Sequence, residues 1–392
     1  QDVIDRYVGA LISEIYYKAR FIDYKATPVR AIFFGGGTPS LLSPKNIIDI
    51  GNAIKINFDM TALQEFSFEM NITSITEERV EALKEIGVTH TRFGLQTMDP
   101  VWRKLFNLEP SIDVIEKAAA MLVPHFDHVL CDIIYGMNGE DEEVIISDLD
   151  KAIALGLSNI EIYPINNVVT SSKLHKSIRD NSDNITSATR KLSMKVLIDL
   201  HMRNKGFMPH NGHGYVRSEN ISDAVVSEDY SFIYHEHLYG YGDHDILGFG
   251  VNAISSLRGY VITNVTGREK YIESMNDNRY LCRISQHDTL LDEMKPIILR
   301  LPYHGYAQKS KIKMKQVPAR LKEKMSELID AGLMVEDDLC FRLTKQGWYW
   351  YSNIMFYLIP ESEQAFLKKI VYEELKKPGR FIAKKEVIYQ SN

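Results

Sequence analysis

Short apolar runs alternate with amphipathic segments through the first half of the chain. The runs are rich in Ile, Phe and Val and too short for helices, which is typical of buried strands. The intervening segments repeat apolar residues at helical spacing, and one opens with a capping Ser43 followed by Pro44. The pattern predicts strands at about 29–34, 65–69, 90–95, 127–134 and 159–163, and helices at about 2–22, 44–57, 76–87, 99–106, 112–122, 141–155 and 185–205.

Regular alternation of strands and helices predicts parallel strands joined by right-handed crossovers. Five such units favour an open or closed α/β barrel over a doubly wound sheet. In barrels of this kind the chemistry lies at the carboxyl ends of the strands. Polar or glycine residues lie at the end of each predicted strand: the turn Gly35–Thr38, then Glu69, Gln96, Asp132 and Tyr163. We therefore expect a ligand site where these strand ends converge.

Residues 206–284 are less regular and are rich in Gly, His, Tyr and Asp. The His-x-His and His-x-x-His spacings within 210–244 are compatible with a metal site. A hydrogen-bonded polar loop cluster is the favoured interpretation, because no thiolate or carboxylate framework accompanies the histidines. A second glycine-rich loop, Leu247–Ala253, either approaches a ligand or turns a corner.

From about residue 285 the chain becomes rich in lysine and helical in pattern. A helix at 318–331 followed by a hairpin about Asp337 and Asp338 suggests a winged-helix-like module. The aromatic segment 348–357 is expected to form a buried helix. We accordingly predict three parts: a barrel over 1–205, an extension over 206–284 that completes the site, and a C-terminal domain over 285–392.

Composition narrows the possible partners. The 392 residues carry a net charge of −6, which gives no electrostatic case for nucleic acid or an anionic membrane. Cys131, Cys282 and Cys340 lie too far apart for a disulfide framework or a metal motif, so a cytoplasmic setting is expected. The first residue is Gln1 rather than Met, and we expect the given chain to start partway into a longer product.

Four motifs occur in a fixed order: Phe34-Gly-Gly-Gly-Thr-Pro-Ser-Leu-Leu42, Phe68-Glu-Met-Asn71, Arg92-Phe-Gly-Leu-Gln96 and Cys131-Asp-Ile-Ile-Tyr-Gly136. Together they resemble the radical S-adenosylmethionine (SAM) enzymes related to oxygen-independent coproporphyrinogen dehydrogenase. Leu247-Gly-Phe-Gly and the segment from Leu343 to Trp350 extend the resemblance over nearly the whole chain.

The resemblance implies a partial (β/α)6 barrel that holds a [4Fe–4S] cluster and SAM. It places Gly36, Gly37 and Thr38 against the methionine part of SAM, and Glu69 at its amino acid or ribose side. Gln96 and Asp132 are implied around the ribose and the reactive centre. These assignments suit the chemistry, since an ammonium and two ribose hydroxyls need carbonyl, carboxylate and amide partners.

Two departures from the family pattern stand out. The cluster motif CxxxCxxC is absent, and by family spacing its three thiolates are expected a few residues before Gln1. In the dehydrogenase an Asn-Arg pair follows the glutamine, whereas here Asn107 is followed by Leu108. This difference argues against the parent activity.

The first functional hypothesis is therefore a radical SAM C-methyltransferase, or a cyclopropane-forming relative, that uses two SAM molecules on an sp2 carbon of a small molecule. The second SAM is expected near Gly37, Thr38, Ile134 and the loop from Phe249 to Ala253. His213, His235 and His237 are candidates for substrate contact or proton transfer. An electron donor such as flavodoxin or ferredoxin is the expected protein partner.

Two alternatives remain open. One is a tetrapyrrole enzyme, either an anaerobic haem-opening methyltransferase or a porphyrinogen decarboxylase, although the sequence shows no Arg/Lys cluster near the motifs for an anionic porphyrin. The other is a haem-carrying chaperone that binds haem without turning over SAM.

Overall fold

A seven-stranded sheet is the centre of the molecule. The computed structural model describes residues 2–21, 27–137, 139–165, 186–227, 233–238, 240–241, 244–257, 259–277, 279–286 and 289–375. The strand order is β1-β2-β3-β4-β5-β7-β6. The strands are β1 (Ala31–Phe34), β2 (Glu65–Met70), β3 (His90–Gln96), β4 (His128–Tyr135), β5 (Asn159–Pro164), β6 (Phe207–Pro209) and β7 (Gly214–Arg217).

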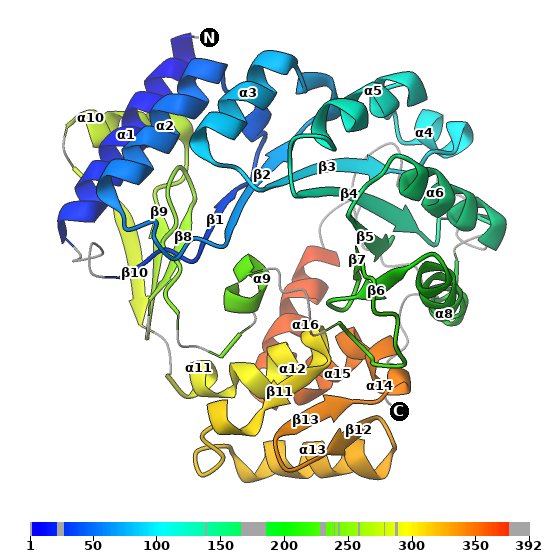
Figure 1. Ribbon diagram of the computed structural model, residues 1–392. Helices are drawn as coiled ribbons and strands as arrows, with labels where there is room; N and C mark the ends of the chain where they lie inside the picture. Colours follow the sequence, from blue (N-terminus) through cyan, green and yellow to red (C-terminus); the bar gives the residue numbers. More distant parts are fainter. Residues whose placement is uncertain are drawn as a thin grey trace.

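The first five strands are parallel, as predicted, and β7 is the strand that breaks the pattern. It pairs with β5 and with β6 in antiparallel register, so β6 runs in the same direction as β1 to β5 but does not pair with β5. The expectation of six repeated strand–helix units is thus corrected at its sixth position, where β7 lies between β5 and β6. Only residues 210–213 join β6 to β7, and so short a connection permits only antiparallel neighbours. Figure 1 shows the result as an open arc with helices along its outer side.

The predicted helices are confirmed, with ends that differ by a few residues. They are α1 (Asp2–Phe21), α2 (Pro44–Asn57), α3 (Glu77–Ile86), α4 (Pro100–Leu105), α5 (Ile112–Leu122), α6 (Glu142–Ala154) and α8 (Ala188–Asn204). Ser43 caps α2 by accepting from the Asn46 N–H, and Thr76 caps α3 in the same way. Apolar residues of α2, α3, α5, α6 and α8 pack on buried strand residues such as Phe66, Phe93 and Ile160 to form the main core, while Val8 and Ile15 of α1 form a separate cluster with α2.

A second sheet flanks the first helix. It comprises β8 (Ile254–Leu257), β9 (Tyr260–Asn264) and β10 (Cys282–Gln286), and α10 (Arg268–Asn276) packs against α1. The short helix α9 (Ile233–Leu238) lies inside the arc, where Tyr234 stacks on Phe33 of β1 with ring centroids 4.5 Å apart.

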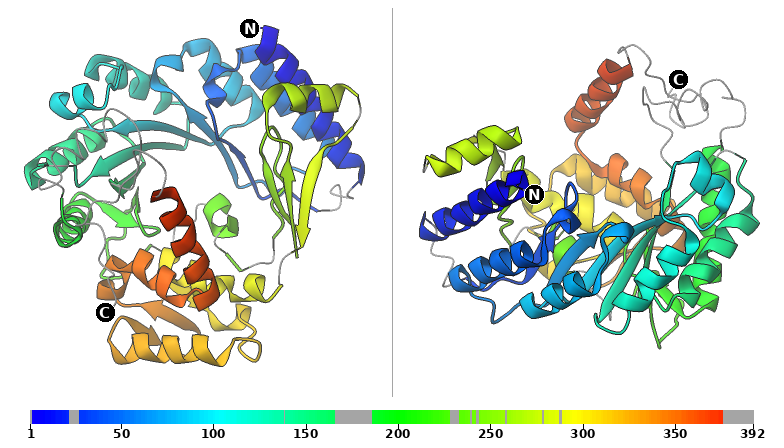
Figure 2. Two further views of the ribbon diagram at one scale, coloured as in Figure 1. Left: turned by 180° about the vertical axis from the view of Figure 1, so that it is seen from behind. Right: turned by 90° about the horizontal axis from the view of Figure 1, so that it is seen from above.

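The C-terminal module, which we define as residues 289–375, faces the open side of the arc (Figures 1 and 2). Its elements are α11 (Thr289–Lys295), a π-helical turn (Pro296–Arg300), α12 (Leu301–His304), β11 (Tyr306–Gln308), α13 (Ala319–Asp330), β12 (Met334–Glu336), β13 (Cys340–Leu343), α14 (Lys345–Tyr349), α15 (Tyr351–Leu358) and α16 (Glu361–Leu375).

The structure confirms the predicted helix and hairpin of this module, as α13 and as the antiparallel pair β12–β13. The aromatic segment 348–357 forms two helices rather than one, with a break at Trp350, and only part of it is buried. The three-part domain division stays a prediction. Within the described ranges, none of the helices has both the length and the apolar character that a bilayer crossing requires.

Candidate functional site

A cavity of about 490 Å³ opens at the carboxyl ends of β1 to β4. Five residues predicted from the sequence line it: Gly37, Thr38, Glu69, Gln96 and Asp132. The other lining residues come from the turn after β1 (Pro39), from β2 and the turn that follows it (70–73), from β3 (92–94) and from the 107–110 loop. Its volume lies in the range typical of small-molecule sites. Parallel strands thus bring these residues together, as expected from their positions at strand ends.

The glycine turn after β1 brings bare backbone to the cavity. Gly36 and Gly37 have φ of +74° and +75°, a conformation that residues with a Cβ rarely adopt. The Gly36 N–H donates to Oε2 of Glu69 over 3.3 Å. A Cβ on Gly35 would collide with the Phe33 ring and approach the Glu69 carboxyl carbon to 3.0 Å. Gly36 and Gly37 are therefore favoured by the positive φ of the turn, and Gly35 by the closeness of the Phe33 ring and the Glu69 carboxyl.

Backbone strain marks the end of β3. Gln96 has φ of +67°, and the pairing of β3 with β4 shifts register between Gly94 and Gln96. The bulge folds the Gln96 side chain back over Gly94, where an added Cβ would lie 2.6 Å from Nε2. Strained non-glycine residues of this kind concentrate at functional sites.

Charged side chains form a row along the inner face of the sheet. The strand register pairs Glu69 with Arg92 and Asp132 with Glu161. Arg92 donates to both carboxylate oxygens of Asp132, at 3.2 and 2.6 Å, and to the hydroxyl of Tyr163 at 2.8 Å. Burial raises the pKa of Asp132, and the guanidinium of Arg92 counteracts part of that rise. Arg92 therefore fixes the Asp132 carboxylate at the cavity wall.

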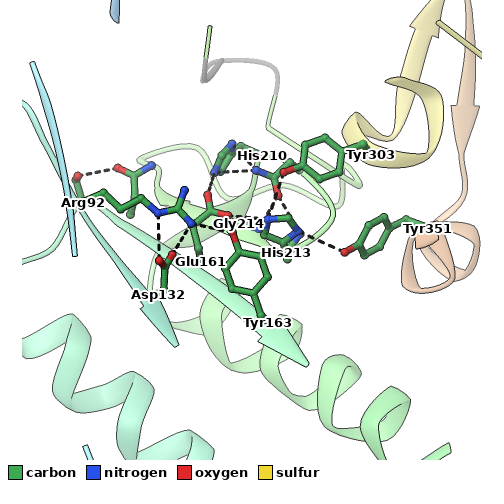
Figure 3. Close-up of polar contacts among 12 residues, drawn as sticks. Arg92, Asp132, Glu161, Tyr163, His210, His213, Gly214, Tyr303 and Tyr351 are labelled. Carbon is green, nitrogen blue, oxygen red and sulfur yellow. Dashed lines mark hydrogen bonds and ion pairs between the residues drawn. The ribbon is translucent and has the colours of Figure 1, made fainter. Parts of the chain in front are cut away.

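A second group of polar residues lies beyond Arg92, between the sheet and the C-terminal module (Figure 3). We call it the seam cluster; its members are Glu161, Tyr163, His210, His213, Tyr303 and Tyr351. The buried Glu161 carboxylate lies 2.9 Å from Nε2 of His213 and 3.3 Å from Nε2 of His210. The Tyr163 hydroxyl donates to it over 3.3 Å. A hydrogen-bonded path thus runs from Asp132 through Arg92 and Tyr163 to Glu161.

The C-terminal module completes the seam cluster. The hydroxyl of Tyr303 lies 3.2 Å from Nε2 of His213, and that of Tyr351 lies 3.3 Å from Nδ1. The Tyr163 ring packs on the His213 ring with centroids 4.2 Å apart. His213 is consequently held by four neighbouring side chains, and its own side chain is 12% exposed.

Glu161 remains charged despite its burial. Desolvation alone would raise its pKa, but His213 and His210 hold that pKa well below its usual range. Gly214 makes room for the arrangement, because a Cβ there would meet Glu161, His210 and Asn211 at 2.4 to 2.8 Å. Such a charge is tolerated inside a protein only when its partners are in place.

The remaining predicted residues lie elsewhere. His235 is buried on α9, where desolvation lowers its pKa to about 4, and its ring lies 6.1 Å from that of Tyr303. The backbone of His237 belongs to α9, but its side chain lies outside the described part of the structure. Ile134 lies in β4 and is not among the cavity-lining residues.

The loop from Phe249 to Ala253 does not line the cavity either. Phe249 packs edge-on against Phe58, with centroids 5.9 Å apart, and lies beneath Nζ of Lys18 at 5.0 Å. Lys18 also donates to the Gly248 carbonyl, which ties this loop to α1. A role for Phe249 and Ala253 in binding a second SAM stays a prediction.

Sequence reasoning assigned no role to four residues of this region: Arg92, Glu161, Tyr303 and Tyr351. Arg92 lies within a recognised motif on a predicted strand, and that position is the sequence feature that points to a role at the site. Glu161 stood in the middle of a predicted strand, and the two tyrosines stood in a distant domain.

The cavity fits SAM in charge as well as in size. Its charged lining residues are Glu69, Arg92, Glu109 and Asp132, which sum to a net charge of −2 (one positive, three negative). SAM carries a sulfonium, an ammonium and a carboxylate, and therefore a net charge of +1. Carboxylate, amide and backbone groups around the cavity match its ammonium and hydroxyl groups.

The described residues do not fit an iron–sulfur cluster. The three cysteines lie apart in β4, β10 and β13, and the described part of the chain holds no group of three His, Cys, Asp or Glu side chains arranged for a metal ion. Because a cluster needs such thiolates, we assign no residue of the described structure to it.

Comparison with known families and proteins finds similarity to radical SAM proteins. Residues 6–152 match the model of the radical SAM superfamily. An anaerobilin synthase of Escherichia coli O157:H7 is 23% identical over 379 residues, which cover 91% of this chain and 77% of the relative. A heme chaperone HemW of Lactococcus lactis subsp. lactis is 21% identical, with 90% of this chain and 88% of the relative covered.

A solved structure shares the fold of this chain. The coproporphyrinogen III oxidase of Escherichia coli, described as a radical SAM enzyme, superimposes with a TM-score of 0.74. The match covers 90% of this chain and 82% of the oxidase at 20% identity, a level that establishes the fold alone. The chain has the mostly parallel α/β fold of that enzyme.

Proposed function

We propose that this chain, a radical SAM protein of the branch that contains coproporphyrinogen oxidase, anaerobilin synthase and heme chaperone HemW, is a radical enzyme that modifies a tetrapyrrole. Of the hypotheses drawn from the sequence, the relatives favour the tetrapyrrole alternative over methylation of an unrelated small molecule. The more specific form of the proposal is haem opening with methyl transfer, after the anaerobilin synthase relative.

The observation that carries the proposal is the seam cluster beside the SAM-sized cavity. A tetrapyrrole is a flat aromatic ring with carboxylate side chains, so it needs aromatic contacts, cations and hydrogen-bond donors. Arg92 and the tyrosines of the seam cluster supply these groups next to the cavity. Arg300, only 3% exposed, is a second guanidinium on the C-terminal module and is paired with Glu236 at 3.1 Å. The sequence alone did not reveal this convergence, because its members are distant along the chain.

SAM, when bound and reductively cleaved, would supply a carbon radical, and a second, intact SAM would supply the transferable methyl group. In our proposal the backbone of Gly36, Gly37 and Thr38 binds its methionine part, and Arg92 orients Asp132 toward the ribose hydroxyls. Glu161 orients His213, which we assign to the substrate side together with His235. The C-terminal module covers the seam cluster through Tyr303 and Tyr351 and so limits the access of water there, as radical chemistry requires. The required electron comes from a donor such as flavodoxin or ferredoxin.

The test is an anaerobic assay of the full-length protein after reconstitution with iron and sulfide. The protein is reduced and mixed with SAM and either haem or coproporphyrinogen, and products are followed by mass spectrometry. We expect 5′-deoxyadenosine and S-adenosylhomocysteine with haem, together with an opened tetrapyrrole that carries an added methyl group. Carbon dioxide release from coproporphyrinogen alone would support a decarboxylase instead. Stoichiometric haem binding without 5′-deoxyadenosine would overturn the enzymatic proposal and favour a carrier.

A further inference from the structure

The charged residues of the SAM cavity are not balanced. Arg92 is the one cation among the described lining residues, and its charge is taken up by Asp132, whose Oδ1 lies 2.6 Å from Nη2. Two carboxylates remain, those of Glu69 and Glu109. Glu69 accepts from the Gly36 N–H. Glu109 makes no hydrogen bond or ion pair with any residue in the described ranges, and it is exposed at the cavity rim.

The loop that carries Glu109 is held in a defined position. Arg103, which is 6% exposed, donates to the carbonyls of Leu95, Thr97 and Pro110 at 3.2, 2.7 and 2.5 Å. The Leu108 N–H donates in turn to the Arg103 carbonyl at 2.9 Å. A buried guanidinium thus fastens the loop to the end of β3, beside Gln96. Glu109 therefore lines the cavity from a loop that hydrogen bonds hold in place.

The chemistry of the expected ligands gives this carboxylate a role. SAM has a net charge of +1, whereas S-adenosylhomocysteine, methionine and 5′-deoxyadenosine each have a net charge of zero. Every product of SAM cleavage or methyl transfer has therefore lost the sulfonium charge. A cavity with a net charge of −2 attracts the substrate more than any of these products.

We propose that Glu109 is a specificity-determining residue that makes the cavity favour SAM over its products, whose net charge is zero, and so assists their release. The inference rests on the proposed use of SAM. The arginine position of the related dehydrogenase, directly after the asparagine, is Leu108 here, and the next residue is the acid Glu109. The loop therefore adds negative rather than positive charge to the cavity rim.

Equilibrium binding tests the proposal without turnover. Affinities for SAM and for S-adenosylhomocysteine are measured by calorimetry for the full-length wild type, for Glu109→Gln and for Glu109→Lys. The matched control is Glu116→Gln, an exposed acid on α5 outside the cavity lining. We expect Glu109→Gln to weaken SAM binding about threefold and Glu109→Lys about tenfold, with S-adenosylhomocysteine binding and the control unchanged. Raising the salt concentration should shrink the difference between wild type and variant.

The outcomes separate this inference from the proposed function. Equal losses of affinity for both ligands would mean that Glu109 contacts their shared amino acid part, and the discrimination proposal would be wrong. Unchanged affinities for both ligands in both variants would overturn it as well. If the wild type binds neither ligand, the proposed function itself fails. Circular dichroism identifies a variant that fails to fold. Glu109→Gln, an isosteric change at an exposed position, is the conservative variant.

Discussion

Along the inner face of the sheet, β1 to β4 border an open cavity, whereas β5 and β7 border a closed hydrogen-bonded cluster. In the cavity, Gly94 and Glu109 are exposed and the acids outnumber the cation. In the seam cluster, Glu161 is fully buried, and His213, His210 and Tyr163 contact its carboxylate. An unbalanced open region is suited to bind SAM, while a balanced closed region is suited to hold its groups in a fixed geometry beside the proposed substrate. Substitutions should therefore change SAM affinity in the first region and stability in the second.

The largest effect should come from Glu161→Gln. The change keeps the shape of the side chain but removes the charge that His213, His210 and Tyr163 surround. Breaking one side of a buried ionic network typically costs several kcal/mol, and we expect a loss of about 3 kcal/mol in the free energy of unfolding. Urea denaturation measures this, with the exposed Glu116→Gln as the control. A loss below about 0.5 kcal/mol would show that the seam cluster is not a stabilising unit.

The same contrast explains what the sequence could predict. The cavity residues follow apolar runs directly, so Gly37, Glu69, Gln96 and Asp132 were placed at strand ends from local pattern alone. The helices and the five parallel strands were predicted on the same local basis. The exposed rim residue Glu109, in contrast, carried no local signal.

The seam cluster had no local signal for a physical reason. Its contacts join residues far apart in the chain: 90 positions separate His213 from Tyr303, and 138 separate it from Tyr351. A single acid within a strand, such as Glu161, is equally compatible with a solvated face. The antiparallel strands β6 and β7 have three and four residues, too few for a period to emerge. These features follow from tertiary packing, which periodicity does not report.

The next effect is a pH dependence from His235, which lies on α9 with its ring 6.1 Å from that of Tyr303 in the seam cluster. Burial lowers the pKa of His235 to about 4, so the folded protein keeps this imidazole neutral while the unfolded chain protonates it near pH 6.5. Between pH 6.5 and 4 the unfolded state binds more protons, and stability falls as the pH falls. At pH 5 the resulting loss in the free energy of unfolding is about 2 kcal/mol. Unfolding free energies from pH 7 to 5 should therefore fall less steeply in His235→Phe, and the exposed His125→Gln should leave the slope unchanged.

A smaller effect is expected in the open region, and on binding rather than stability. Gly94→Ala places a Cβ 2.6 Å from Nε2 of Gln96. The glutamine side chain can swing away at little cost to folding, but it then leaves the cavity wall. We expect about a tenfold loss of SAM affinity, the value of roughly one good hydrogen bond, with an unfolding midpoint within about 1 °C of wild type. Gly9→Ala on α1, where nothing lies within 4 Å of the added Cβ, is the control. Unchanged affinity would place Gln96 outside the SAM site.

Tyr351→Phe should give the smallest effect and the cleanest division between the two regions. The variant removes only the hydroxyl that lies 3.3 Å from Nδ1 of His213 and leaves the aromatic ring in place. The expected loss of stability is about 1 kcal/mol, the net value of one hydrogen bond, and SAM affinity should not change. Denaturation and calorimetry on the same preparation measure both quantities, with the exposed Tyr260→Phe as the control. If SAM affinity fell as well, the path from Tyr351 through His213, Glu161, Tyr163 and Arg92 would transmit a change to the cavity. The seam cluster would then act on ligand binding, and the two regions would have to be treated as one site.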